Sequence, residues 1–143
     1  MSQDSPKNSS FGGQYPMRVF ETTLTVATGA TSATDTSRTM FKGTIEKIEI
    51  DPGAAMATSA TLKGYEANTD LATGTRDHFL NYTFPESEAE LVIYPLKPTT
   101  TNDGSTATDP LNYVKHVVND NLRLDLASAV AADSVTVRVY VRG

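Results

Sequence analysis

Hydrophobic and polar residues alternate most regularly near the C-terminal end of the chain. Every second residue of 135–141 is a valine, and polar residues or a tyrosine stand between them. The segment 121–127 repeats this period with three leucines. The apolar residues of the two segments are Leu122, Leu124, Leu126, Val135, Val137, Val139 and Val141. Because successive side chains of a strand point to opposite faces of a sheet, both segments are predicted to be strands with one buried face.

Six further segments predict strands. They are 17–27, 38–50, 59–67, 77–84, 90–97 and 113–118. Their β-branched and aromatic residues suit a pleated surface, and no apolar pattern of helical period extends beyond two turns. Polar segments rich in small residues separate them, and two of these, 28–37 and 97–110, are predicted to be loops.

The segment 38–50 breaks its own alternation. Ile45 is out of phase with Ile48 and Ile50, so a regular strand cannot bury all three on one face. One extra residue in the strand would restore the phase. We therefore expect a bulge or bend near Gly43–Lys47.

The spacing of these segments defines the expected fold class. About eight strands at intervals of roughly 8–15 residues are typical of an all-β protein with two antiparallel sheets packed as a sandwich. We expect a jelly-roll-like arrangement, with a Greek-key sandwich as the alternative. Residues 1–16 lack periodicity and predict an extended N-terminal arm, which leaves 17–143 as a single β-sandwich domain.

Composition and charge exclude several classes of function. The 12 Lys and Arg residues stand against 17 Asp and Glu, a net charge of −5, which disfavours a sequence-independent nucleic-acid binder. The chain has no Cys, so disulfides and thiolate chemistry are ruled out. Its apolar runs fall far short of the ~18 residues that a membrane-spanning helix needs. The start of the chain also lacks the basic and apolar parts of a signal peptide. We expect neither a nucleic-acid nor a membrane partner.

Candidate catalytic groups are few. His78 and His116 lie in predicted strands and are interpreted as exposed polar residues. The carboxylates of Glu86, Glu88 and Glu90 alternate along one segment, and paired carboxylates can serve glycoside hydrolysis. A polar turn between strands explains that run more simply. We therefore expect no enzymatic activity and no catalytic residues.

The loop 98–110 offers oxygen atoms that a calcium ion could use. These belong to Asn102, Asp103, Ser105 and Asp109. The loop lacks the ligand order of a calcium-binding EF-hand, and Asn-Asp-Gly is equally typical of an exposed turn. We expect no metal and no cofactor.

Exposed aromatic residues could instead form a carbohydrate-binding platform. Six tyrosines are scattered through the chain, but tryptophan is absent. A carbohydrate-binding or adhesion module therefore stands as an alternative function. Its contact surface would be the loops 28–37, 68–76 and 98–110.

Two sequence stretches carry a resemblance to a known class of proteins. The first is FKGTIEKIEIDPGAAMATSATLKGYE at 41–66, and the second is the ending SVTVRVYVRG. Both are similar to small β-rich proteins encoded among the virion structural genes of tailed bacteriophages, and the similarity covers most of 17–143. It implies a non-enzymatic capsid decoration (cement) protein that binds the outer surface of the shell of major capsid protein and stabilises it. A head–tail or tail accessory protein is the alternative within that class.

The N-terminal arm is the expected partner-binding segment. Its aromatic anchors, Phe11 and Tyr15, flank the flexible pair Gly12 and Gly13. Such a segment can follow the contour of a partner's groove and become ordered on binding. We expect it to contact the major capsid protein or a neighbouring copy, in a homotrimer at symmetric positions on the capsid surface, with a dimer as the alternative.

Overall fold

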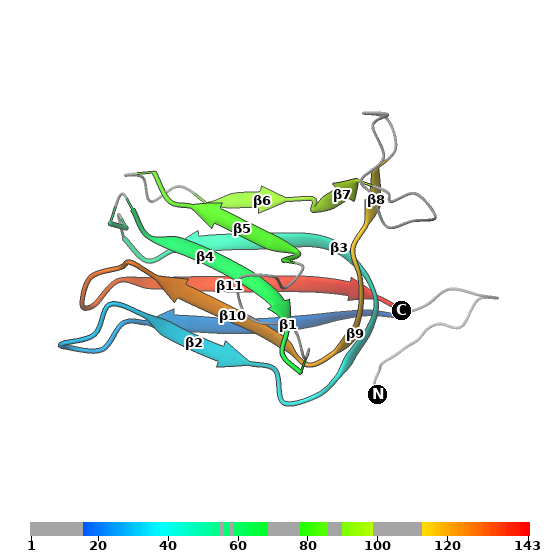
Figure 1. Ribbon diagram of the computed structural model, residues 1–143, viewed down its shortest axis with the longest axis horizontal. Helices are drawn as coiled ribbons and strands as arrows, with labels where there is room; N and C mark the ends of the chain where they lie inside the picture. The colour runs from blue at the N-terminus through cyan, green and yellow to red at the C-terminus, as the bar shows by residue number, and fades with distance from the viewer. Residues whose placement is uncertain (1–15, 55, 58, 69–77, 86–89, 99–112) are drawn as a thin grey trace.

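The computed structural model describes residues 16–54, 56–57, 59–68, 78–85, 90–98 and 113–143. These residues form eleven strands and no helix, and every strand pair is antiparallel (Figure 1). The predicted all-β class is therefore confirmed. The strands are β1 (Met17–Thr25), β2 (Ala33–Thr36), β3 (Phe41–Pro52), β4 (Thr61–Glu66), β5 (Leu80–Thr83), β6 (Leu91–Ile93), β7 (Leu96–Pro98), β8 (Tyr113–Lys115), β9 (Val117–Asp120), β10 (Leu122–Ala127) and β11 (Ser134–Arg142).

The sequence predicted about eight strands, and the difference has local causes. Strand β2 lies inside the segment 28–37, which was expected to be a loop, and it has no fully buried residue that could have revealed it. The segment 90–97 divides into β6 and β7 around Pro95, because a proline has no N–H with which to continue a strand ladder. The segment 113–118 divides into β8 and β9 at His116.

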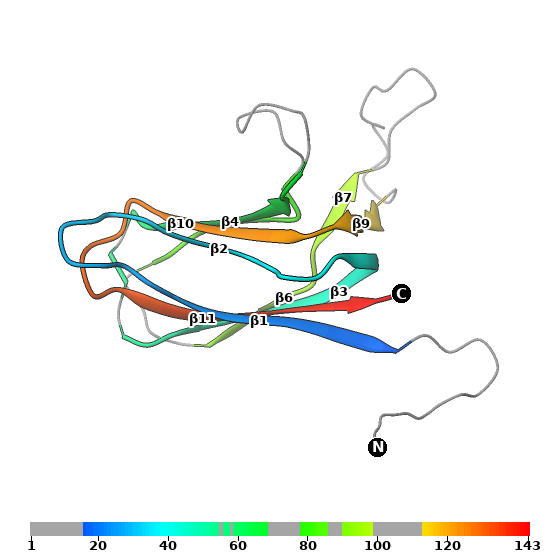
Figure 2. The ribbon, with the colours of Figure 1, turned by 90° about the horizontal axis from the view of Figure 1, so that it is seen from below.

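Two larger sheets and a short ribbon hold the described strands. The first sheet has the order β1-β11-β3-β6, and β9 also pairs with β3. The second sheet has the order β2-β10-β4-β5, and β7 pairs with β8 alone. Figure 2 shows β1, β11 and β3 in one layer and β2, β10 and β4 in the other. Strands β9 and β10 follow each other directly, so this stretch of chain passes from the first sheet to the second at Asn121.

Side chains from both layers form the core. The predicted core residues are all 1% exposed or less: Leu122, Leu124, Leu126, Val135, Val137, Val139 and Val141. The residues between them, Arg123, Asp125, Thr136 and Arg138, are only partly buried on the opposite faces. The alternation therefore assigned both faces of β10 and β11 correctly.

The predicted bulge lies within β3. Lys47 pairs with Tyr140 and Ile45 with Val141, so Glu46 is the extra residue on the β3 side of the ladder. This shift lets Ile45 point to the same side as Ile48, and β3 buries its isoleucines together.

Gly43 holds the strand start against the end of β11. Its φ is +142°, and a Cβ atom there would collide with the backbone of Arg142 and Gly143. No other residue type fits without moving one of the two strands.

Replacing Leu124 by Ala should lower the free energy of unfolding by about 2–5 kcal/mol, because the side chain is fully buried and leaves a cavity. Val130→Ala is the control. Its side chain is exposed, so its effect should stay within about 0.5 kcal/mol. Urea denaturation measures both, and a Leu124→Ala variant as stable as the control would contradict the assigned core.

Gly43→Ala should destabilise the protein more than Gly29→Ala. Both glycines have positive φ, but a Cβ at Gly29 (φ +84°) meets nothing within 4 Å. The Gly29 variant therefore carries only backbone strain of about 1–3 kcal/mol, whereas the Gly43 variant adds the collision with Arg142. Thermal melts compare them, and equal losses would show that β3 and β11 separate freely at this end.

Candidate functional site

Exposed apolar side chains lie at one end of the molecule, on the outer face of the first sheet where β1 begins and on the adjoining stretch from β6 to β7. We define the end patch as Met17, Val19, Tyr94, Leu96 and Val117. Tyr94 and Val117 are each 68% exposed and Leu96 is 55% exposed. Exposed apolar side chains around a depression of the surface indicate an interaction site.

Strand register places Met17 and Val117 on the same face, at the two ends of one row, with Arg142 and Thr44 between them. Met17 pairs with Arg142, which pairs with Thr44, which in turn pairs with Val117. Residues directly opposite each other in a ladder share a face, so this row runs across four strands on the outer side of the sheet.

The next row of the same face begins at Val19. It continues through Tyr140 to Lys47. The Nζ atom of Lys47 lies 4.6 Å from the centre of the Tyr140 ring, which is a cation–π contact. The two rows place Met17, Val19 and Val117 on one face together with the charged side chains of Arg142 and Lys47.

A groove of about 310 Å³ lies within the end patch. We call it the patch groove. Its apolar walls are Met17, Tyr94, Pro95 and Leu96, and its charged groups are Glu46, Lys47 and Lys115. The residues come from β1, β3, β8 and the stretch from β6 to β7, so four parts of the chain build one depression.

The charges of the patch groove are paired with one another or with close neighbours. Lys115 Nζ donates to Glu46 Oε1 at 2.8 Å, and Lys47 Nζ lies 3.4 Å from Glu49 Oε2. The hydrogen bond from Lys115 holds the pKa of Glu46 below its usual value, helped by Thr44 and Arg142 against partial burial. The patch groove therefore presents apolar walls beside charged groups that each have an ion-pair partner.

A polar cluster occupies the outer face of the second sheet. The Tyr65 hydroxyl donates to Asp125 Oδ2, and Asp125 Oδ1 accepts hydrogen bonds from Arg123 Nε at 2.9 Å and Thr34 Oγ1 at 2.8 Å. The ring of His78 meets Tyr65 edge-on, with centroids 5.4 Å apart. Burial disfavours the charged form of Asp125, but these hydrogen bonds outweigh it and lower its pKa. The cluster ties β2, β10 and β4 together.

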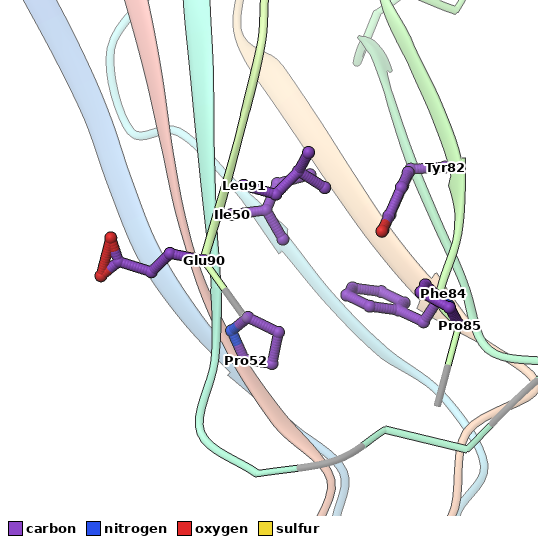
Figure 3. Close-up of a pocket in the computed structure, with 7 residues that line it drawn as sticks. All are labelled: Ile50, Pro52, Tyr82, Phe84, Pro85, Glu90 and Leu91. Atoms are coloured by element: carbon purple, nitrogen blue, oxygen red, sulfur yellow. The ribbon is translucent and has the colours of Figure 1, made fainter. Parts of the chain in front are cut away.

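A smaller cavity of about 190 Å³ lies between the sheets beside β5 and β6 (Figure 3). It is lined by Ile50, Pro52, Tyr82, Phe84, Pro85, Glu90 and Leu91. The rings of Tyr82 and Phe84 meet edge-on at 5.0 Å. The Glu90 carboxylate points away from Tyr82 in the close-up, so the two groups do not form an acid–base pair there.

The predicted partner-binding residues of the arm lie outside the described part of the chain. These are Phe11, Gly12, Gly13 and Tyr15. The proposed calcium ligands of the loop 98–110 also lie outside it, as do Glu86 and Glu88. Glu90 is described and exposed at the rim of the smaller cavity.

The two histidines differ from their interpretation as exposed strand residues. His116 is buried, at 7% exposure, and its carbonyl accepts a hydrogen bond from the Ile45 amide at 2.9 Å. The interpretation was therefore wrong for His116, because the chain turns from the β7–β8 ribbon into the first sheet at this residue. His78 precedes β5 and is partly buried.

Within the described residues, no group of three or more His, Asp or Glu side chains could hold a metal ion. The same residues contain no helix that is long and apolar enough to cross a membrane.

The end patch was missed by the sequence analysis, although a signal for it exists. Residues 91–96 read LVIYPL, which is apolar at every position rather than alternating. An apolar run on a strand whose sheet is covered on one side leaves apolar residues on the open side. That pattern was interpreted only as a strand.

Comparisons with protein-family models, with curated proteins and with solved structures find no match to this chain.

Asp125→Asn should destabilise the protein above about pH 4 and flatten the pH dependence of its stability. Because the pKa of Asp125 is lowered on folding, its carboxylate stabilises the fold above the unfolded pKa of about 3.9. That contribution is lost as the pH falls through the folded pKa. Losing charge-assisted hydrogen bonds at this site should cost about 1–3 kcal/mol at pH 7.

The control for this measurement is Asp51→Asn. Asp51 has no side-chain hydrogen bond or ion pair within the described residues. Urea denaturation between pH 3 and 7 separates the two variants. If the pH dependence of the Asp125 variant matched that of the wild type, the cluster would contribute nothing to acid stability.

Proposed function

We propose that this chain is a non-enzymatic structural protein of a phage virion. It acts as a capsid decoration protein that binds the outer surface of the shell of major capsid protein and stabilises it. The observation that carries the proposal is the end patch, a set of exposed apolar side chains on the outer face of the first sheet and on the adjoining stretch from β6 to β7. A shell-binding module needs such a surface on a rigid scaffold, and it needs no active site.

The resemblance to small virion proteins of tailed phages supports the same class. It rests on the stretch 41–66, which supplies β3 and β4, and on the ending SVTVRVYVRG, which supplies β11. A head–tail or tail accessory protein would use the same kind of surface and is the alternative within the class.

The fold that we propose for this role is a jelly-roll sandwich. Support comes from the strand order, β1-β11-β3-β6 in one sheet and β2-β10-β4-β5 in the other. Strands β1 to β4 alternate between the two sheets, and so do β5 and β6, and β10 and β11. This alternation is typical of eight strands wound as two Greek keys.

A carbohydrate-binding or adhesion module is the second candidate. It is favoured by the exposed ring of Tyr94, since sugar rings stack on exposed aromatic side chains. In that case the patch groove would hold a saccharide. In the carbohydrate role Tyr94 stacks on a sugar ring, whereas in the decoration role shell binding depends on the apolar residues outside the groove. The two roles can therefore be separated by variants.

The deciding experiment mixes the purified chain with empty shells of the major capsid protein from the encoding phage and measures co-sedimentation. The double variant Val19→Ser and Val117→Ser changes the end patch outside its groove. It should weaken binding at least about tenfold, because buried apolar anchors dominate interface energetics. Val130→Ser is the control and should bind as the wild type, because this exposed side chain lies in the turn between β10 and β11, at the opposite end of β11 from Arg142.

A glycan array completes the test. Saccharide binding that is lost in Tyr94→Ala, together with no binding to shells, would replace the decoration role with the carbohydrate role. Shell binding that is unaffected by the double variant would show that the end patch is not the contact surface.

A further inference from the structure

We propose that the patch groove receives the N-terminal segment, residues 1–15, of a second copy of this chain. The inference rests on the proposed function in that both use the end patch. The groove joins copies of the chain to each other, and the apolar residues outside it face the shell.

The position of the segment is the first argument. The described chain begins at Pro16, and Met17 is both the first residue of β1 and a wall of the patch groove. In each copy the N-terminal segment is therefore attached to the chain beside that copy's own groove. When two copies approach at this end, each segment starts next to the other copy's groove.

The length of the segment is the second argument. Fifteen extended residues reach about 50 Å, whereas a domain of this size has a radius of gyration of about 15 Å. The segment can therefore span to a neighbouring copy. Tyr15 precedes Pro16, and a residue before proline favours extended backbone.

Charge is the third argument. Residues 1–15 carry one acidic and one basic side chain, Asp4 and Lys7, so their formal side-chain charge is zero. The charged groups of the patch groove are already paired, Lys115 with Glu46 and Lys47 with Glu49. A neutral segment with aromatic anchors leaves those pairs intact, whereas a charged ligand would have to displace one of them.

The shape of the groove fits an aromatic anchor. The groove has a volume of about 310 Å³, and its walls include Tyr94 and Pro95. An aromatic side chain buries a large area against such surfaces. Phe11 stands before Gly12 and Gly13, which let the backbone follow the groove closely. We therefore assign Phe11 as the residue that enters the groove.

Exchange of a segment between copies produces one of two kinds of closed assembly. Two copies that exchange segments reciprocally form a dimer, and copies that pass segments in one direction close a ring. A ring of three is the homotrimer expected from the sequence.

A disulfide trap tests this directly, because the chain contains no Cys. One protein carries Ser10→Cys, next to Phe11, and a second carries Leu96→Cys, on the wall of the patch groove. Mixed in the absence of shells under mild oxidation, they should form a mixed disulfide dimer. The control replaces Leu96→Cys by Thr23→Cys, on the same face but six residues along β1 from Met17, about 20 Å away.

The expected rate of cross-linking is at least about tenfold higher with Leu96→Cys than with Thr23→Cys, because docking raises the effective concentration of the two thiols. Adding Phe11→Ala to the Ser10→Cys protein should reduce the rate to the control value. Equal rates at the two sites would overturn the inference.

A single chain with both Ser10→Cys and Leu96→Cys separates exchange from self-docking. Exchange gives covalent oligomers on a non-reducing gel, whereas a closed monomer would show that the segment occupies its own groove and would overturn the proposal. Light scattering of the wild type and of a chain lacking residues 2–14 adds the oligomeric state. A strictly monomeric wild type would also overturn it.

These outcomes are distinct from failure of the decoration role. The trap and the light scattering contain no shells. Shell binding depends on Val19 and Val117, which do not line the patch groove. Copies that cross-link in solution but ignore shells would retain the exchange and exclude the decoration role.

Discussion

The burial of Ile45, Ile48 and Ile50 on one side of β3 is the constraint on which the first sheet depends. Strand β3 pairs with β11 along one edge and with both β9 and β6 along the other, so its register determines three neighbours. Three isoleucines at this spacing cannot share a face of a regular strand. The extra residue Glu46 resolves the conflict.

That extra residue also shapes the patch groove. Glu46 lines the groove, and its carboxylate accepts hydrogen bonds from Thr44 at 3.0 Å and from Lys115 at 2.8 Å. Arg142 Nε lies 3.9 Å away. The isoleucines of the core require an extra residue on one side of β3, and that residue, Glu46, provides the carboxylate of the patch groove on the other side. The hydrophobic pattern and the candidate site are connected through one residue.

The sequence predicted those parts of the fold in which one face of a strand is apolar and the other polar. Strands β10 and β11 and the bulge in β3 belong to this set. Strand β2 was not predicted because none of its residues is fully buried. Its position depends on pairing with β10 rather than on its own burial. Tyr65 lies on the same face of β4 as Lys63 and hydrogen-bonds to Asp125, yet it is 1% exposed. Its burial arises from neighbours on other strands, which a linear pattern does not contain.

The candidate site was less predictable for a related reason. The end patch combines Met17, Tyr94 and Val117, which are distant in sequence and which the strand order brings to the same end of the molecule. The arm residues Phe11 and Tyr15 were selected on local grounds, as aromatic groups beside glycines. Where such groups bind depends on the surface that receives them.

The pairing of Met17 with Arg142 has a mechanical consequence (Figure 1). The start of β1 and the end of β11 lie side by side in an antiparallel ladder. Tension applied between these two ends would open the ladder from Met17 inwards, one pair at a time, at low force. Tension carried from Met17 to the far end of β11 at Ser134 would instead shear the ladder, with its hydrogen bonds loaded together. The fold therefore resists traction along β1 far better than peeling at its end, so its strength depends on where it is anchored.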